Sequence, residues 1–238
     1  MSLPVEISPN PLLRSTVEIR FSINIDRAKL FSIVYPAFAS QFPIFEENKV
    51  PKELRKISPE FRFAPDYILK NDDFSLSFSS NLVAFENISE YKYWRNYFPF
   101  IKGQLSTFFQ LNIIEKISRI GVRYASLFEG KNRIDEVLNF MPGIPVDEYE
   151  QTFSLIRLDL KKRYYNFHVQ LANNAQAIKG NKPISGAYID IDGSFSGQQS
   201  PSSEIFMLID ELHTEGKKIF FEKLIKPSFL ETLNPKYE

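Results

Sequence analysis

Two aspartates near the end of the chain have the spacing that metal or acid–base chemistry uses. Asp190 and Asp192 alternate with Ile189 and Ile191 in the segment Tyr188-Ile-Asp-Ile-Asp-Gly193. Because successive strand residues point to opposite faces, both carboxylates are expected on one face of a strand. Two such carboxylates can share a hard divalent cation or divide the roles of general acid and base. The simpler alternative is that they face solvent or pair with arginines on a neighbouring strand.

A group of arginines on expected strands could also do chemistry. Its members are Arg20, Arg119, Arg123 and Arg157. A guanidinium can hold a phosphate or carboxylate with two parallel N–H donors. The alternative is ordinary ion pairing with Glu18, Asp190 or Asp192, worth up to about 1 kcal/mol each at a surface. In either case, a sheet face that carries both Arg and Asp is the best candidate for a ligand surface.

The chain has two histidines, His168 and His213. His213 follows Asp210 by three residues in a helical pattern, which places the two side chains on one side of the helix. An Asp–His pair can orient a general base, whereas the alternative is a histidine at the boundary of the core. Together with Asp190 and Asp192, His213 supplies the residues for a metal-assisted hydrolase or nucleotide-processing enzyme.

Composition and motifs argue against several classes of protein. Lys and Arg number 29, as do Asp and Glu, and there is no Cys. The zero net charge does not favour nucleic acid as a partner, and the lack of Cys excludes disulfides and thiolate catalysis. The chain has no P-loop, dinucleotide fingerprint, nucleophile elbow or zinc-protease motif, so we expect no cofactor and no metal site. No signal peptide or long apolar run is present, which predicts a cytoplasmic protein without a membrane span.

These residues must be positioned by strands and helices, which the hydrophobic pattern predicts. The elements expected in the first half are a strand over 16–24, a helix over 28–42, strands over 61–69, 74–79 and 82–88, and a helix over 90–111 capped by Ser89. Those expected in the second half are a strand over 117–127, a short helix over 132–140, strands over 151–160, 164–172 and 186–194, and a helix over 200–224. A polar loop is expected over 173–183. The predicted order is β-α-β-β-β-α in each half.

A faint repeat supports this order. The segments Ser15–Ile23 and Ser118–Ser126 both carry Arg at the sixth place and an aromatic residue at the seventh. We therefore predict an α+β fold with two pseudo-repeated units, residues 1–114 and 115–238, in one compact body. The units would form a continuous antiparallel sheet with helices on one face. This topology resembles the TATA-binding-protein-like and helix-grip folds, and a shared topology does not by itself carry a function.

Several short segments also resemble one protein family. They are Asn10-Pro-Leu, Val17-Glu-Ile-Arg-Phe21, Arg119-Ile-Gly-Val-Arg-Tyr124, Ile189-Asp-Ile-Asp192 and Leu208-Ile-Asp-Glu-Leu-His213 followed by Phe220-Phe-Glu222. Together they resemble an uncharacterised, sporadically distributed bacterial family, over essentially the whole chain. The resemblance implies no activity and assigns no catalytic residue. Its patchy distribution suggests an association with mobile elements or defence.

The sequence therefore favours a binding or interaction protein without enzymatic activity, which uses the sheet face or the cleft between its units. The ligand-binding candidates are Arg20, Arg119, Arg123, Asp190, Asp192 and His213. The alternative is the metal-assisted enzyme described above. An aromatic cluster around Trp94 also favours a protein partner or a homo-oligomer, because Trp and Tyr are enriched at interfaces.

Overall fold

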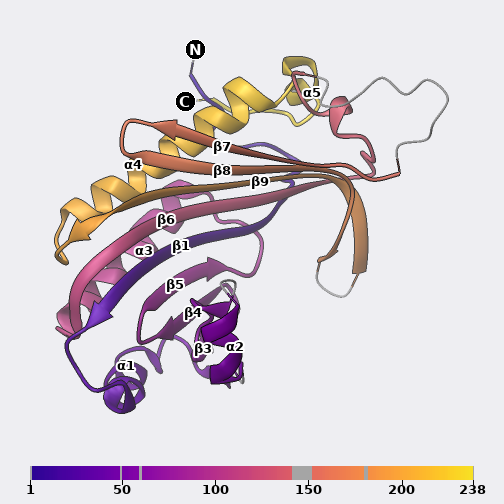
Figure 1. Cartoon of the computed structure of the whole chain (residues 1–238). Coiled ribbons are helices and arrows are strands. Elements are labelled where there is room, and N and C mark those ends of the chain that lie inside the picture. The colour runs from indigo at the N-terminus through magenta and orange to yellow at the C-terminus, as the bar shows by residue number, and fades with distance from the viewer. Residues whose placement is uncertain (1, 49, 59–60, 141–151, 180–181, 238) are drawn as a thin grey trace. The chain divides into compact units, whose positions relative to one another are not determined.

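The computed structural model describes residues 2–48, 50–58, 61–140, 152–179 and 182–237 (Figure 1). Its strands are β1 Leu12–Ile23, β2 Ile44–Glu47, β3 Tyr67–Lys70, β4 Phe74–Ser79, β5 Leu82–Asn87, β6 Ile114–Glu129, β7 Leu155–Lys162, β8 Tyr165–Lys179 and β9 Lys182–Gln199. Within the described residues they form one nine-stranded antiparallel sheet, in the order β2-β3-β4-β5-β1-β6-β9-β8-β7. The predicted α+β class with a continuous antiparallel sheet is thus confirmed.

The helices lie between and after these strands. They are α1 Leu30–Phe38, α2 Lys52–Ile57, α3 Trp94–Gln110, α4 Glu204–Lys218 and α5 Pro227–Glu231. Asp26 caps the short 3-10 turn before α1, since its carboxylate accepts a hydrogen bond from the Ala28 amide. Pro36 lies inside α1 without ending it. In the described part of the chain, no helix is both long enough and apolar enough to cross a membrane.

Contacts divide the chain into two interleaved units. Unit 1 consists of Met1–Ser15, Arg123–Ser194 and Glu211–Glu238, and unit 2 consists of Thr16–Val122 and Phe195–Asp210. Strands β1, β6 and β9 contribute residues to both units. The division between residues 114 and 115 that the repeat predicts is a different one, and it stays a prediction.

The core of unit 2 forms on one face of β1. Val17, Ile19 and Phe21 alternate with polar residues and are buried, as a half-buried strand requires. The Phe21 ring lies 5.7 Å from that of Phe108 on α3. The fully buried Tyr97 of α3 donates a hydrogen bond from its hydroxyl to the Phe85 carbonyl oxygen of β5, so this polar group is paired within the core.

The core of unit 1 forms between β8, β9 and α4. Phe167 on β8, Ile189 and Ile191 on β9 and Leu212 on α4 are all buried. Burial of a side chain of this size stabilises the fold by roughly 1.5–3 kcal/mol. The odd-numbered positions around 189–191 thus face the core, and the aspartates between them face the other side of the sheet.

The first half of the chain differs from the prediction at its loops. The helix expected over 90–111 begins at Trp94, and Ser89 does not cap it, because the Ser89 hydroxyl donates to Asp73 instead at 2.6 Å. Of the strand expected over 61–69, only the part from Tyr67 onward is a strand. Strand β2 and helix α2 were not expected from the pattern, since both are short and every residue of β2 is exposed.

The second half differs where polar strands extend away from the core. The loop expected over 173–183 is wrong, because β8 continues to Lys179 and β9 begins at Lys182. The helix expected over 132–140 is only a 3-10 turn over Ile134–Glu136. The strand expected over 151–160 is β7, which starts at Leu155, while residue 151 lies outside the described residues. The last long helix begins at Glu204 rather than at residue 200.

Candidate functional site

Arg123 on β6 and Asp190 on β9 form the best-defined charged pair in unit 1. The guanidinium donates from Nε to Oδ1 at 2.9 Å and from Nη2 to Oδ2 at 2.5 Å, which is the bidentate arrangement of a strong ion pair. The Asp190 side chain is 3% exposed, whereas that of Arg123 is 44% exposed. One edge of the guanidinium is therefore fixed on a buried carboxylate, while the Arg123 side chain as a whole is partly exposed.

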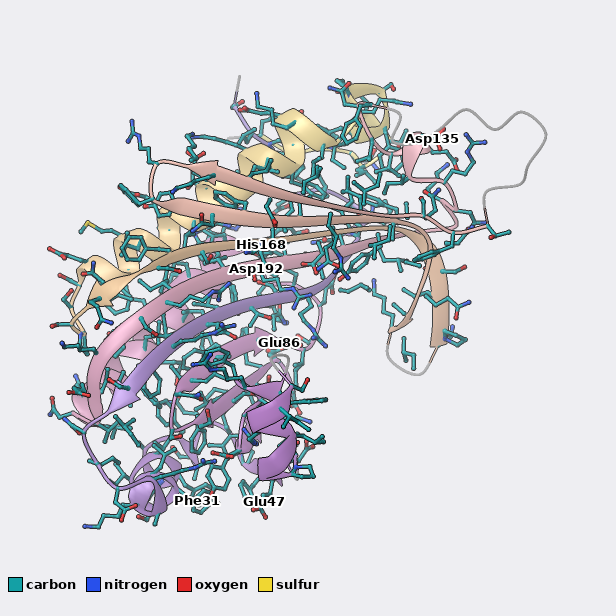
Figure 2. All side chains as sticks on the ribbon, viewed as in Figure 1. Phe31, Glu47, Glu86, Asp135, His168 and Asp192 are labelled. Carbon is teal, nitrogen blue, oxygen red and sulfur yellow. The ribbon has the colours of Figure 1, made fainter. Side chains whose placement is uncertain are left out.

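The surroundings of this pair stabilise both charges. Hydrogen bonds from Arg123 to Asp190 raise the pKa of the guanidinium, against a smaller opposing effect of burial. The Tyr188 hydroxyl donates to Asp190 Oδ2 at 3.2 Å. Burial, followed by the negative charge of Asp190, raises the pKa of Tyr188, so that its hydroxyl remains a donor at neutral pH. Asp192 on the same strand (Figure 2) also acts electrostatically on Arg123, in the same direction as Asp190.

Unit 2 holds a second charged group, which is centred on Glu18. Its Oε1 accepts hydrogen bonds from Arg20 Nε at 2.7 Å and from Arg119 Nη1 at 2.8 Å. The Arg20 guanidinium lies 3.9 Å from the centre of the Phe63 ring, a distance typical of a cation–π contact. The three charged side chains are between 14% and 26% exposed. Arg20 and Arg119 are therefore joined by a shared carboxylate rather than held open for a ligand.

Gly121 makes room for this arrangement. The Arg119 side chain extends along its own strand toward Gly121. A Cβ atom built on Gly121 would overlap the Arg119 guanidinium. The absence of a side chain at this position thus lets Arg119 reach Glu18.

His213 lies apart from the two aspartates. Its Nδ1 is 2.7 Å from the Tyr124 hydroxyl, and the two rings meet edge to face. Tyr124 and Arg123 are adjacent on β6, so their side chains point to opposite faces of the sheet. His213 is therefore on the face opposite to Asp190. Burial, with a smaller effect of Lys217, lowers the pKa of His213 to about 3, which leaves the ring uncharged at neutral pH.

The group expected for a metal-assisted enzyme is consequently not assembled. Asp190 and His213 are separated by the sheet, and the described residues contain no group of three His, Asp or Glu side chains that could hold a metal ion. The partner that the structure gives Asp210 is the Trp94 indole, which donates to it at 2.7 Å, whereas the ring of His213 contacts the Tyr124 hydroxyl. His168 pairs with the exposed Asp159 on β7.

Arg123 and Asp190 were predicted from the sequence, but the aromatic residues that surround the charged groups were not. Tyr188 and Tyr124 were identifiable in principle, because they lie on strands beside the residues they support. Phe63 carried no such signal, because its contact with Arg20 depends on a turn that joins distant parts of the sequence.

No family model and no curated protein matches this chain.

Proposed function

We propose that this chain is a binding protein that recognises a polypeptide through the sheet face around Arg123. The observation that carries the proposal is the contrast within the Arg123–Asp190 pair. Asp190 is buried and fixes one edge of the guanidinium, while the Arg123 side chain as a whole is 44% exposed. A guanidinium has five N–H donors, and this pair uses two of them. Arg123 also hydrogen-bonds with the Tyr188 side chain, and the remaining N–H groups form a rigid donor group that loses little conformational freedom when a ligand binds.

The charge balance favours a ligand rich in neutral acceptors. Asp190 compensates the charge of Arg123, and the charge of Asp192 acts on Arg123 as well. A polyanion such as nucleic acid therefore gains little from this group, because its affinity depends on neutralising phosphates with surplus positive charge. Peptide carbonyl oxygens accept from N–H donors without requiring that surplus.

The strand order supports the proposed pseudo-repeat. On either side of the central pair β1 and β6, the sheet continues with β5, β4 and β3 in one direction and with β9, β8 and β7 in the other. Each half therefore places its first strand at the centre and its later strands outward in reverse order. A duplicated unit of the TATA-binding-protein-like type, with helices on one face, would produce this order, while β2 and α2 would be insertions in the first copy.

A peptide selection tests the proposal. Random displayed peptides are selected on the whole chain, and the affinity of enriched peptides is measured by fluorescence anisotropy. The variant Arg123→Lys keeps a positive charge on Asp190 but loses the planar donors, so we expect it to bind about tenfold more weakly, equivalent to about 1.4 kcal/mol. The control Arg133→Lys changes an exposed arginine that pairs with Asp135 elsewhere in unit 1, and it should bind normally.

Two results would contradict the proposal. One is a set of peptides that binds both variants as tightly as the unchanged chain, provided that Arg123→Lys has a similar free energy of unfolding. The other is stabilisation of the chain by short nucleic acids in a thermal-shift screen that also contains metals and nucleotides. The metal-assisted alternative has less support, because its three residues lie on two faces of the sheet.

A further inference from the structure

Strand β7 is an edge of the sheet and pairs on one side alone within the described residues. Its register with β8 runs from Leu155 opposite Ala172 to Lys162 opposite Tyr165, and β7 stands last in the strand order. An eight-residue edge presents a row of backbone N–H and C=O groups that can pair with another strand. Its side chains are mostly exposed, including Leu155 and Leu160 at 43% and 41%.

The sequence of β7 is complementary to itself. If two copies of β7 pair antiparallel about a twofold axis through Leu158, Arg157 of each copy lies directly opposite Asp159 of the other. Both side chains are exposed, and Asp159 is 82% exposed while it contacts His168. Its carboxylate can therefore accept a further pair of hydrogen bonds from an arginine.

The other face of β7 is complementary as well. Lys162 pairs with Glu215 of α4, so Ile156, Leu158 and Leu160, which alternate with the charged residues, share the face that α4 covers. In the same register, Leu158 meets its own copy and Ile156 meets Leu160 twice. The same strand pairing would thus bring the apolar side chains together on one face of the sheet and the charged side chains together on the other face.

Neighbouring registers are disfavoured by charge. Residues that lie opposite each other must point to the same face if the two sheets are to become one continuous sheet. Moving the axis to position 157 places two arginines opposite each other, and moving it to position 159 places two aspartates opposite each other. Like charges in directly opposed positions destabilise a strand pair. Of these three registers, the one through Leu158 is therefore the one that the charges favour.

We propose that this chain forms a twofold homodimer by antiparallel pairing of its β7 strands, centred on Leu158. Isologous contacts of this kind are the usual basis of a dimer, and they remove the exposed edge from both copies. The inference rests on unit 1 alone and does not depend on the proposed peptide site at Arg123.

Charge exchange at two positions tests the dimer. The whole chain is studied by sedimentation velocity over a range of concentrations, and we expect a monomer–dimer equilibrium. Either Arg157→Asp or Asp159→Arg puts like charges opposite each other, and each should raise the dimer dissociation constant at least tenfold. The double variant Arg157→Asp/Asp159→Arg restores opposite charges and should recover the dimer. The control Lys223→Asp, at an exposed lysine outside β7, should leave the dissociation constant unchanged.

A mixing experiment distinguishes pairing between positions 157 and 159 from a general effect of the substitutions. The variant Arg157→Asp has acidic side chains at positions 157 and 159, and the variant Asp159→Arg has basic side chains at both positions. When the two are combined, each acidic side chain of one chain faces a basic side chain of the other, so a mixed dimer should form at concentrations at which neither variant dimerises alone.

Three results would overturn the proposal. The first is an unchanged chain that is a monomer at all concentrations, and the second is a mixture that stays monomeric while both variants remain folded by circular dichroism. The third is loss of selected-peptide binding in the β7 variants of a monomeric chain, which would assign this edge to a peptide instead of a second copy.

Discussion

At the scale of single residues, the charged groups of the sheet differ in how much of each arginine they leave available to a ligand. Glu18 joins two arginines, and Asp190 fixes one. The pairing with acidic residues that the sequence offered as the simpler alternative is therefore what the structure contains. It also leaves one guanidinium in a defined orientation at the surface, which free arginine side chains do not provide.

The first prediction concerns the energetic coupling of Arg123 and Asp190. Arg123→Met should destabilise the protein by about 2 kcal/mol, because it leaves a buried carboxylate without its partner. The double variant Arg123→Met/Asp190→Leu should cost less than the sum of its single changes, with a coupling energy above about 1 kcal/mol. Urea unfolding of the unchanged protein, the two single variants and the double variant measures this coupling energy. Additive effects of the two substitutions would show that the pair has no coupling energy.

The second prediction concerns His213 and pH. Its pKa is about 3 in the folded protein against an ordinary 6.5, so below pH 6.5 the unfolded chain takes up a proton that the folded chain does not. Stability contributed by the neutral ring is complete above pH 6.5 and falls as the pH decreases toward 3. Between pH 7 and pH 5.5 the free energy of unfolding should fall by about 1 kcal/mol more in the unchanged protein than in His213→Gln. Equal pH dependence of the two proteins would be inconsistent with an uncharged His213.

At the scale of elements, the close approach of neighbouring backbones determines whether a strand can accept a side chain in place of glycine. Gly186 on β9 lies against β6, where a Cβ atom would overlap the carbonyl oxygen of Phe128. Gly103 on α3 has no atom near the position of its missing Cβ. The two glycines therefore provide a matched comparison of the same change in a crowded and an open environment.

The third prediction follows from this contrast. Gly186→Ala should destabilise the protein by more than about 2 kcal/mol, since two strands must move apart. Gly103→Ala should stabilise it by up to about 1 kcal/mol, because Ala is the better helix former and nothing opposes it. Thermal unfolding of both variants checks the signs, and a neutral Gly186→Ala would mean that β6 and β9 adjust without cost.

The elements that could be predicted are those with a strong apolar pattern. The alternation at Val17, Ile19 and Phe21 predicted β1, and the alternation of Phe and Ser from Phe74 predicted β4. The polar ends of β8 and β9 were not predictable, because two strands that extend beyond the core carry no apolar signal. The pairing of Arg123 with Asp190 was one of several possibilities, since strand order, which decides it, is a property of the whole fold.

At the scale of the whole molecule, the two units share strands rather than a linker. Residues of β1, β6 and β9 belong to both units, so neither unit can lose these strands without affecting the other. The single tryptophan, Trp94, lies in unit 2 and donates to Asp210 of the same unit. Its fluorescence therefore reports on one unit, whereas far-ultraviolet circular dichroism reports on the whole chain.

The fourth prediction is that unfolding is cooperative. Tryptophan fluorescence and circular dichroism should give the same midpoint and slope in urea, because shared strands couple the two units. A fluorescence transition that clearly precedes the loss of circular dichroism would show that unit 2 unfolds on its own.

The interleaving of the units also has a consequence for synthesis on the ribosome. Unit 2 is completed only by Phe195–Asp210, and unit 1 only by the segment that follows it. Neither unit therefore has all of its segments until most of the chain has been translated. Domains that are contiguous in sequence can fold one after another during translation, but this arrangement prevents it. The nascent chain should consequently remain incompletely folded until the segment after Asp210 has left the exit tunnel.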